Sequence, residues 1–232
     1  MTLEEAAEYV HVPANDLKHF AQRGEVEGVE RNGQWRFDVR TLAEWAQRNL
    51  LSSSARELDE QNRHMDESAR RSHSGEWRVA DFFRENAVEL GLAARAKGGV
   101  LRDLADLAEA SGLCYDRESL FRELVSREER VPTAVGGGCA FPHAHVLDPY
   151  MFETAFVAYA RSPRGVFFGG PDGEATRHFF LVCSVDHAMH LRVLARLARL
   201  AKRTQLLEML DAAETPDAAI AAVREAERGL GR

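Results

Sequence analysis

Cysteine is scarce in this chain of 232 residues. Cys114, Cys139 and Cys183 are odd in number, widely spaced and without a CxxC pair, so neither a disulfide framework nor a zinc ribbon is expected. Positive charge is not in excess either, because the net charge is −7, which gives no general electrostatic case for binding nucleic acid or an acidic membrane. No apolar run approaches the length of a membrane span, and the acidic start MTLEEAAEY does not have the features of a signal peptide. We therefore expect a cytoplasmic protein with no membrane insertion.

The remaining composition is ordinary for a globular protein, with 45% hydrophobic and 29% charged residues. A chain of this length forms one large domain or two smaller ones. The local patterns favour two domains, residues 1–50 and 77–232, joined by a polar segment.

Residues 1–50 have the pattern of a helix, a turn, a second helix, a hairpin and a third helix, which is a winged-helix outline. The signals follow one another along the chain: a capping box at Thr2 and Glu5, a second helix over about 14–23 closed by Gly24, a hairpin turn at Asn32-Gly33, and the helix cap Asp38.

Residues 51–76 are polar and lack a core-forming pattern. Ser54 with Glu57 is a second capping signal, and Leu51, Leu58 and Met65 recur every seven residues. One apolar residue per heptad is a thin seam for a coiled coil, so we predict a solvated linker and a domain boundary here.

Residues 77–232 alternate apolar strands with amphipathic helices, which predicts an α/β sandwich. Apolar runs at 154–160 and 178–185 suit buried strands. A short strand or extended entry and two helices are expected before Gly112. The further helices are expected over 116–129, 188–203, 204–212 and after the cap Thr215.

The segment AVGGGCAFPHAHV, residues 134–146, holds the strongest candidate site. Gly136, Gly137 and Gly138 allow a ligand to approach the backbone closely, and Pro142 fixes the backbone just before His143. A neutral imidazole is a competent nucleophile toward phosphorus, and its transfer chemistry depends on cations that absorb charge on the phosphoryl oxygens. Arg127 and His190 are the side chains expected to supply that support.

The spacing alone leaves other interpretations open. The glycines and His143 fit a tight turn, Arg127 lies in the charged run SREER typical of a solvated helix end, and His190 fits a surface histidine. A metal site is the further alternative, since His143-x-His145 and His187-x-x-His190 together supply four imidazoles.

The segment LVSREERVPTAVGGGCAFPHA resembles the enzyme IIA domain of the bacterial phosphotransferase system, of the fructose/mannitol and nitrogen-regulatory type. The resemblance extends from about residue 77 to residue 227. The matching positions are Glu128 at the start of the signature, Val135 and Gly136, and the box Ala140, Pro142, His143 and Ala144.

This resemblance implies a mixed sheet flanked by helices. We expect no cofactor and no bound metal. It implies that His143 accepts a phosphoryl group from a phosphohistidine carrier of the HPr type, and that Arg127 and His190 support the phosphate. The alternative on the same fold is a non-catalytic protein-interaction or metal-binding regulator.

Residues 1–50 resemble an excisionase/MerR-type helix-turn-helix domain, through their element order and the hairpin exit Gly-Gln-Trp-Arg-Phe. The resemblance implies that the second helix enters the major groove of DNA and that the hairpin contacts the backbone. Because one small unit gives a small footprint, we expect binding as a homodimer. The candidate DNA-binding residues are Asn15, Lys18, His19, Gln22 and Arg23, with Arg31 and Arg36 on phosphates. Residues 1–49 hold six Lys/Arg against nine Asp/Glu, so a protein-interaction role stays open.

Overall fold

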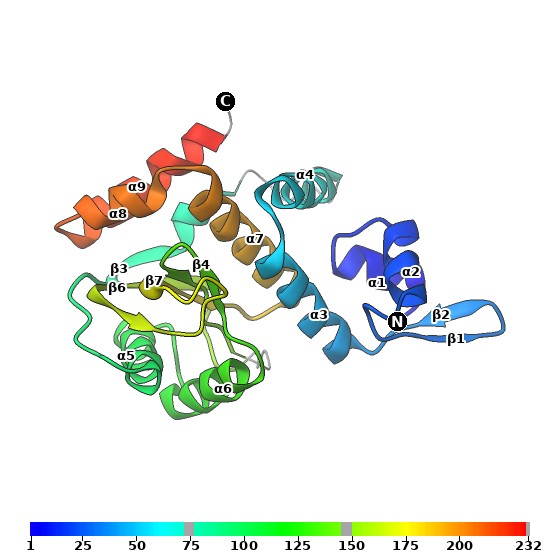
Figure 1. Cartoon of the computed structure of the whole chain (residues 1–232), viewed down its shortest axis with the longest axis horizontal. Helices are drawn as coiled ribbons and strands as arrows, with labels where there is room; N and C mark the ends of the chain where they lie inside the picture. Colours follow the sequence, from blue (N-terminus) through cyan, green and yellow to red (C-terminus); the bar gives the residue numbers. More distant parts are fainter. Residues whose placement is uncertain (72–76, 145–149, 231–232) are drawn as a thin grey trace. The chain divides into compact units, whose positions relative to one another are not determined.

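The computed structural model describes residues 1–71, 77–144 and 150–230. The chain divides into two compact units, Met1–Glu76 and Trp77–Arg232, and Figure 1 labels most of their elements. No helix within the described ranges combines the length and the apolar character that crossing a membrane requires.

The first unit has the element order that the sequence predicts. Its elements are α1 (Leu3–Tyr9), α2 (Ala14–Gln22), β1 (Val29–Arg31), β2 (Gln34–Arg36), α3 (Val39–Ser52) and α4 (Ala55–Arg71). Both hydrogen bonds of the predicted capping box at Thr2 are present, and the Asp38 side chain accepts bonds from the first turn of α3. Asn32 and Gly33 have φ angles of 52° and 74°, which is the left-handed pair that a two-residue hairpin turn of type I′ needs.

The core of this unit forms between the inner faces of its first three helices. Ala6, Leu17 and Leu42 are fully buried, and Phe20 packs against Trp45 with their ring centroids 5.3 Å apart. Because the apolar side chains of α2 point into this core, its opposite face is exposed. That face carries candidate DNA-binding residues.

The prediction of a solvated linker over 51–76 is wrong for residues 55–71, which form the helix α4. The backbone N–H of Ser54 donates to the Glu57 carboxylate at 2.7 Å, and the Ser54 hydroxyl accepts from the Glu57 N–H at 3.4 Å. Leu58 and Met65 of the seven-residue repeat are buried. A reciprocal capping box therefore starts this helix, and Leu58, Asn62 and Met65 give it a buried side. Residues 72–76 lie outside the described part of the chain.

The second unit is a mixed α/β structure, as predicted, and its sheet has five strands. Its elements are the 3-10 turn η1 (Val79–Phe82), β3 (Phe83–Glu89), α5 (Lys97–Ala110), α6 (Arg117–Arg130), β4 (Ala134–Gly136), β5 (Cys139–Ala140), β6 (Phe156–Phe167), β7 (Ala175–Cys183), α7 (His187–Arg203), α8 (Leu206–Ala212) and α9 (Pro216–Leu230). The strand order is β3-β6-β7-β5-β4. The pairs β3–β6 and β5–β7 are parallel, whereas β6–β7 and β4–β5 are antiparallel.

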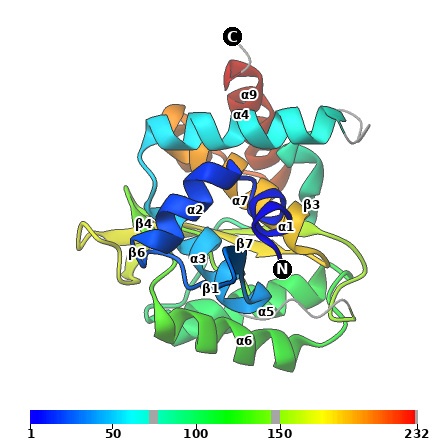
Figure 2. The ribbon, with the colours of Figure 1, turned by 90° about the vertical axis from the view of Figure 1, so that its right-hand side faces the viewer.

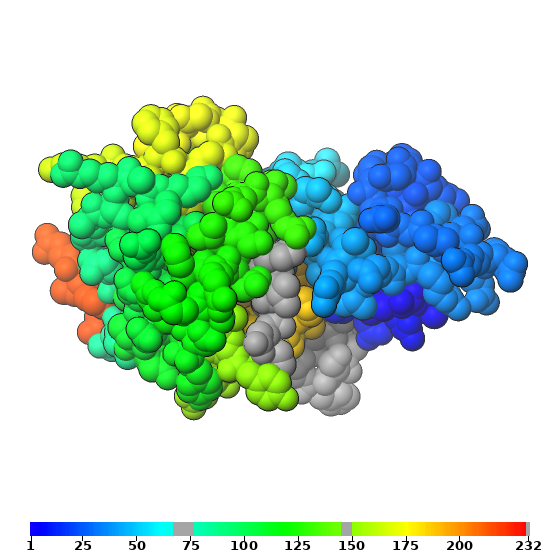
Figure 3. Space-filling view, turned by 90° about the horizontal axis from the view of Figure 1, so that it is seen from below, coloured from blue at the N-terminus to red at the C-terminus, as the bar shows by residue number. Residues whose placement is uncertain are grey.

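Helices cover both faces of this sheet. Figures 1 and 2 show α5 and α6 on one face and α7, α8 and α9 on the other, and in Figure 3 the green residues of α5 and α6 cover the near side of the unit. All six residues from His178 to Cys183 in β7 are buried. Burial on both faces explains why this central strand reads as a continuous apolar run rather than an alternating one.

Of the short strand and two helices predicted before Gly112, the strand is present as β3, but the prediction of two helices is wrong because only one forms. The sequence ENAVELGLAARA is rich in good helix formers, but Val88 and Glu89 pair with Tyr159 and Ala160 of β6. Pairing with a buried neighbouring strand outweighs local propensity at this edge of the sheet. The single helix there is α5.

Candidate phosphohistidine site

The backbone of His143 extends the line of β5 beside the central strand β7. His143 forms a parallel bridge with Val182, and the Val182 N–H donates to the Pro142 carbonyl at 2.9 Å. Pro142 has a fixed φ and no N–H of its own, so its carbonyl is the group that joins this segment to the sheet. The histidine side chain is fully buried and projects from a rigid backbone.

Two hydrogen bonds define the protonation of the His143 ring. Its Nδ1 lies 2.7 Å from the Phe141 carbonyl oxygen, and its Nε2 lies 3.0 Å from Nε of Arg127. A carbonyl only accepts and a guanidinium only donates. We therefore assign the proton to Nδ1 and the lone pair to Nε2, which gives a neutral ring whose nucleophilic nitrogen faces a cation.

Arg127 occupies the last turn of α6 and is 5% exposed. Its Nη1 donates to the Val131 carbonyl at 2.7 Å, which anchors the guanidinium on the chain segment that leaves the helix. The interpretation of SREER as a solvated helix end fails at this position, because one arginine of the run turns inward to His143.

His190 lies in the first turn of α7 with its ring centroid 5.1 Å from that of His143 and an interplanar angle of 60°. It is fully buried, and neither of its ring nitrogens has a hydrogen-bond partner within the described part of the chain. Burial, with smaller contributions from His187 and Arg127, lowers the pKa of His190 to about 3. The ring is therefore neutral at physiological pH and retains an uncommitted N–H donor.

The structure thus brings together the three residues that the sequence singled out, His143, Arg127 and His190. The three glycines behave differently from the expectation that they let the backbone approach a ligand. All three have positive φ in the tight turn between β4 and β5, and the Gly137 N–H donates to the Asp172 carboxylate at 2.7 Å. This amide is committed within the protein, so the turn interpretation is the one that the geometry supports.

The metal alternative has less support. His145 lies outside the described residues, and among the described ones no group of three or more His, Cys, Asp or Glu side chains is placed to hold a metal ion. Cys139 and Cys183 are buried, and burial raises the pKa of each thiol, which disfavours the thiolate form that binds metals.

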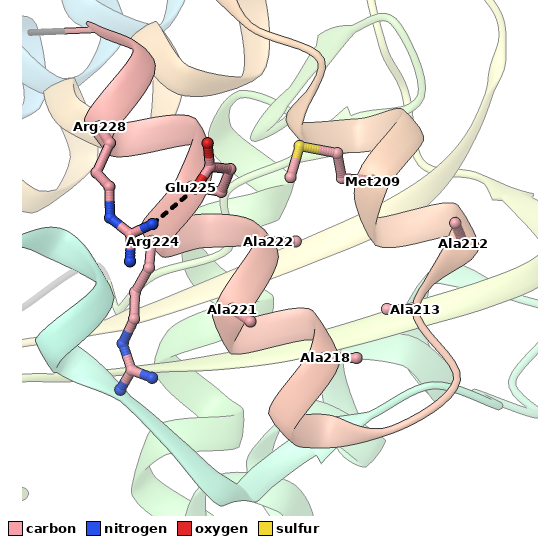
Figure 4. A pocket seen from close by; sticks show the side chains of 9 residues that line it. All are labelled: Met209, Ala212, Ala213, Ala218, Ala221, Ala222, Arg224, Glu225 and Arg228. Atoms are coloured by element: carbon pink, nitrogen blue, oxygen red, sulfur yellow. Dashed lines mark hydrogen bonds and ion pairs between the residues drawn. The ribbon is translucent and has the colours of Figure 1, made fainter.

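A separate groove lies between α8 and α9 (Figure 4). Its lining is mostly small: Met209, Ala212, Ala213, Ala218, Ala221, Ala222, Arg224, Glu225 and Arg228. Glu225 and Arg228 pair with each other at 2.7 Å. The groove contains no imidazole and no nucleophilic side chain, so it is not part of the candidate site.

The candidate DNA-binding residues are distributed over α2 and the hairpin. Exposed side chains are Asn15, His19, Gln22, Arg23, Arg31 and Arg36, while Lys18 is half-buried. Nε of Arg23 lies 2.5 Å from the Glu25 carboxylate, which offsets part of the charge of this surface.

Sequence reasoning named Glu128 only as the start of a motif, and it missed the role of Thr133 and Lys97. Glu128 is 4% exposed and accepts hydrogen bonds from both. The Glu-to-Thr spacing was a usable signal, because it places Thr133 just after the helix that carries Glu128. No signal in the sequence pointed to Lys97, which lies 31 residues earlier.

Comparison with known proteins gives matches for both units. The family described as "Phosphoenolpyruvate-dependent sugar phosphotransferase system, EIIA 2" matches residues 81–226, and the family described as "Helix-turn-helix domain" matches residues 1–50. The first match spans more than half of the chain and includes His143, Arg127 and His190.

Two curated relatives and one solved structure illustrate the match. A nitrogen regulatory protein of Bradyrhizobium diazoefficiens is 32% identical over 121 residues, covering 51% of this chain and 76% of that protein. The fructose-specific EIIABC component of Bacillus subtilis is 25% identical over 156 residues, covering 65% of this chain but only 24% of that protein. The IIA-Ntr crystal structure from Neisseria meningitidis aligns with a TM-score of 0.55 at 21% identity, covering 62% of this chain and 98% of that one, which shows a shared fold.

Proposed function

This chain belongs to the EIIA 2 family of the phosphoenolpyruvate-dependent sugar phosphotransferase system, and we propose that its Nε2 atom of His143 accepts a phosphoryl group from a phosphohistidine carrier of the HPr type. The observation that carries the proposal is the placement of that nitrogen. It bears the lone pair of a neutral ring, it is buried, and it lies 3.0 Å from the guanidinium of Arg127. We further propose that the protein acts as a regulator that senses carrier phosphorylation.

The chemical step is a transfer between two imidazoles. The N–P bond of the donor histidine breaks as the bond from phosphorus to Nε2 of His143 forms. A donor ring protonated on its other nitrogen leaves as a neutral imidazole. His143 keeps its Nδ1 proton, held by the Phe141 carbonyl, and becomes the protonated phosphohistidine. No external base is required, because the donor ring changes from cationic to neutral while the His143 ring changes from neutral to cationic.

The two flanking residues have complementary roles in this scheme. Arg127 presents a planar set of N–H donors to the three phosphoryl oxygens, on which charge is distributed during transfer. His190 is neutral and adds one N–H donor from a dry position, where an aligned dipole stabilises charge more strongly than it would in water. Burial also limits hydrolysis of the phosphohistidine.

The direct test is incubation of the full chain with a phosphorylated HPr-type carrier, followed by intact-mass measurement. Wild type should gain one phosphoryl group and His143→Ala none, while His64→Ala, an exposed histidine of α4, should behave as wild type. Wild type that stays unmodified would instead favour a non-catalytic interaction module. A phosphoryl group that persists in His143→Ala would move the site elsewhere.

For the first unit we propose binding to duplex DNA through α2 and the hairpin. Support comes from the helix-turn-helix match over residues 1–50 and from the exposure of Arg31 and Arg36 on the hairpin. The candidate DNA-binding residues include four cations, and this number limits how steeply the DNA affinity can fall with salt: Lys18, Arg23, Arg31 and Arg36. The slope of log K against log salt should be no steeper than about −4 per module, and a homodimer would double it.

The DNA proposal is tested with a pool of random-sequence duplexes, by measuring binding over a range of salt concentrations. Removing both hairpin arginines, Arg31→Ala with Arg36→Ala, should reduce the slope by about 2 per module. Arg48→Ala removes an exposed charge on α3 and should leave the slope unchanged. A wild-type protein that selects no duplex, or an equal effect of all three changes, would favour a protein partner for this unit.

A further inference from the structure

A buried carboxylate lies directly beside Arg127 in the sequence. The Glu128 side chain is 2% exposed and accepts four hydrogen bonds from two residues. The Thr133 N–H donates to both carboxylate oxygens at 3.2 and 3.1 Å, and the Thr133 hydroxyl donates at 2.6 Å. Nζ of Lys97 donates at 3.1 Å. Burial raises the pKa of Glu128, while Thr133 and Lys97 oppose that rise, so these donors favour the ionised form.

The clamped threonine is linked in turn to the ring of His143. Its carbonyl accepts from the Phe141 N–H at 3.1 Å, and the Phe141 carbonyl accepts from Nδ1 of His143 at 2.7 Å. Thr133 is therefore held on one side by Glu128 and on the other by Phe141. Adjacent residues of α6 thus act on opposite nitrogens of one ring, Arg127 at Nε2 directly and Glu128 at Nδ1 through two residues.

We propose that Glu128 is a positioning residue, which fixes the Nδ1–H tautomer and the orientation of His143 by holding Thr133 and, through it, Phe141. This inference rests on the proposed phosphoryl transfer at Nε2. It explains why a buried carboxylate is maintained near a site that binds an anion, where an unpaired negative charge would oppose phosphate binding. The carboxylate makes its hydrogen bonds to Thr133 and Lys97, so its role in this proposal is to hold Thr133 in place.

The expected size of the effect follows from the need for alignment. The attacking lone pair must point at phosphorus, and a misplacement of about 1 Å can reduce a rate by about 100-fold. If Thr133 is released, the Phe141 carbonyl shifts with it, and Arg127 alone then opposes a proton on Nε2 of His143. A ring protonated on Nε2 has no lone pair to attack with. Loss of Glu128 should therefore reduce the turnover rate more than the binding of the carrier.

The test combines the tautomer of His143 with the kinetics of transfer, both in the full chain. Ring ¹⁵N chemical shifts should show Nδ1–H in wild type and a mixture of tautomers in Glu128→Ala. Glu128→Gln keeps an oxygen that can accept from Thr133 and should restore most of the Nδ1–H form. With a phosphorylated HPr-type carrier, kcat of Glu128→Ala should fall about 10- to 100-fold, with KM changed by less than about threefold.

A matched control exists in the same unit. Glu227 is another largely buried carboxylate that accepts from backbone amides, those of Val79 and Ala80. Within the described residues, none of its hydrogen bonds is to Thr133, Phe141 or His143. Glu227→Ala should leave the tautomer unchanged. An unchanged tautomer in Glu128→Ala, or an equal change in Glu227→Ala, would overturn the inference.

Two further outcomes keep the inference separate from the proposed function. If Glu128→Ala fails to fold, Thr133→Val removes only the hydroxyl bond and should give an intermediate mixture of tautomers; a pure Nδ1–H ring there would contradict the proposal. If wild type accepts no phosphoryl group, the transfer function fails, whereas the ring shifts still decide whether Glu128 positions His143.

Discussion

Replacing His190 with glutamine tests whether the site is as dry as its burial indicates. Burial lowers the pKa of His190 to about 3, with smaller contributions from His187 and Arg127, whereas an unfolded histidine has a pKa of about 6.5. The unfolded chain therefore binds a proton below about pH 6.5 that the folded chain rejects until about pH 3. The resulting stability is present above the unfolded pKa and is lost as the pH falls toward the folded one.

The magnitude follows from the two pKa values. At pH 5 the unfolded state gains about 2 kcal/mol relative to the folded state from this group, since the pH lies about 1.5 units below the unfolded pKa. At pH 7 the same contribution is only about 0.2 kcal/mol. The free energy of unfolding of wild type, taken relative to His190→Gln, should therefore fall by about 2 kcal/mol between pH 7 and pH 5.

Urea unfolding of both proteins at the two pH values measures this difference, and the Cε1–H resonance of His190 reports its titration directly. His64→Gln, on the exposed face of α4, controls for the loss of an imidazole that folding does not bury. Parallel stability curves for wild type and His190→Gln would refute the reasoning. So would a His190 resonance that titrates near pH 6.5, because the ring would then be hydrated.

Three further predictions concern stability and are measured by urea unfolding at pH 7. Gly136→Ala should lower the free energy of unfolding by about 1–3 kcal/mol, because φ is +85° and the new Cβ would lie 2.9 Å from the Asp172 carboxylate. The control Gly229→Ala lies in open space on α9 and should be neutral or stabilising by up to about 1 kcal/mol. Equal effects of the two changes would contradict the strain argument. Asp38→Ala removes the two cap bonds of α3 and should cost about 1 kcal/mol, and no loss would show that the cap is dispensable. Arg161→Met should cost about 2 kcal/mol, because one guanidinium nitrogen donates to three carbonyls at the end of α8; a variant as stable as wild type would show that these bonds contribute nothing net.

The site was predictable from the sequence where its residues lie in one local motif. Pro142 and His143 stand together, and Arg127 follows from the motif that precedes the glycines, so the resemblance places all three. His190 lies 47 positions after His143, and it was identified by the family resemblance and by the rule that a helix following a buried strand starts at the same edge of the sheet as the other residues. The geometry then adds what no pattern contains, namely the tautomer of His143.

The parts that the sequence did not predict depend on contacts between distant segments. The sequence predicts a strand entry near the start of β3 but a helix over its continuation, where Val88 and Glu89 pair with β6. The segment of α4 was predicted as a linker because burial at Leu58 and Met65 cannot be seen in an otherwise polar sequence. Likewise, the bond from Lys97 to Glu128 joins the start of α5 to the end of α6. In each case the structure depends on contacts between residues that are distant in the sequence, and local propensity does not contain that information.

The contact between Arg127 and His143 also sets a condition on phosphoryl transfer. In-line attack needs phosphorus within about 3.5 Å of Nε2 along the lone pair, and Nε of Arg127 now occupies that direction at 3.0 Å. The guanidinium must therefore release the ring as the donor arrives. The phosphoryl oxygens that replace the ring nitrogen are stronger acceptors for the same donors. Their hydrogen bonds to Arg127 therefore offset the loss of the bond between Arg127 and Nε2. In the proposed transfer, Arg127 thereby protects the lone pair in the resting site and binds the phosphate once the ring attacks.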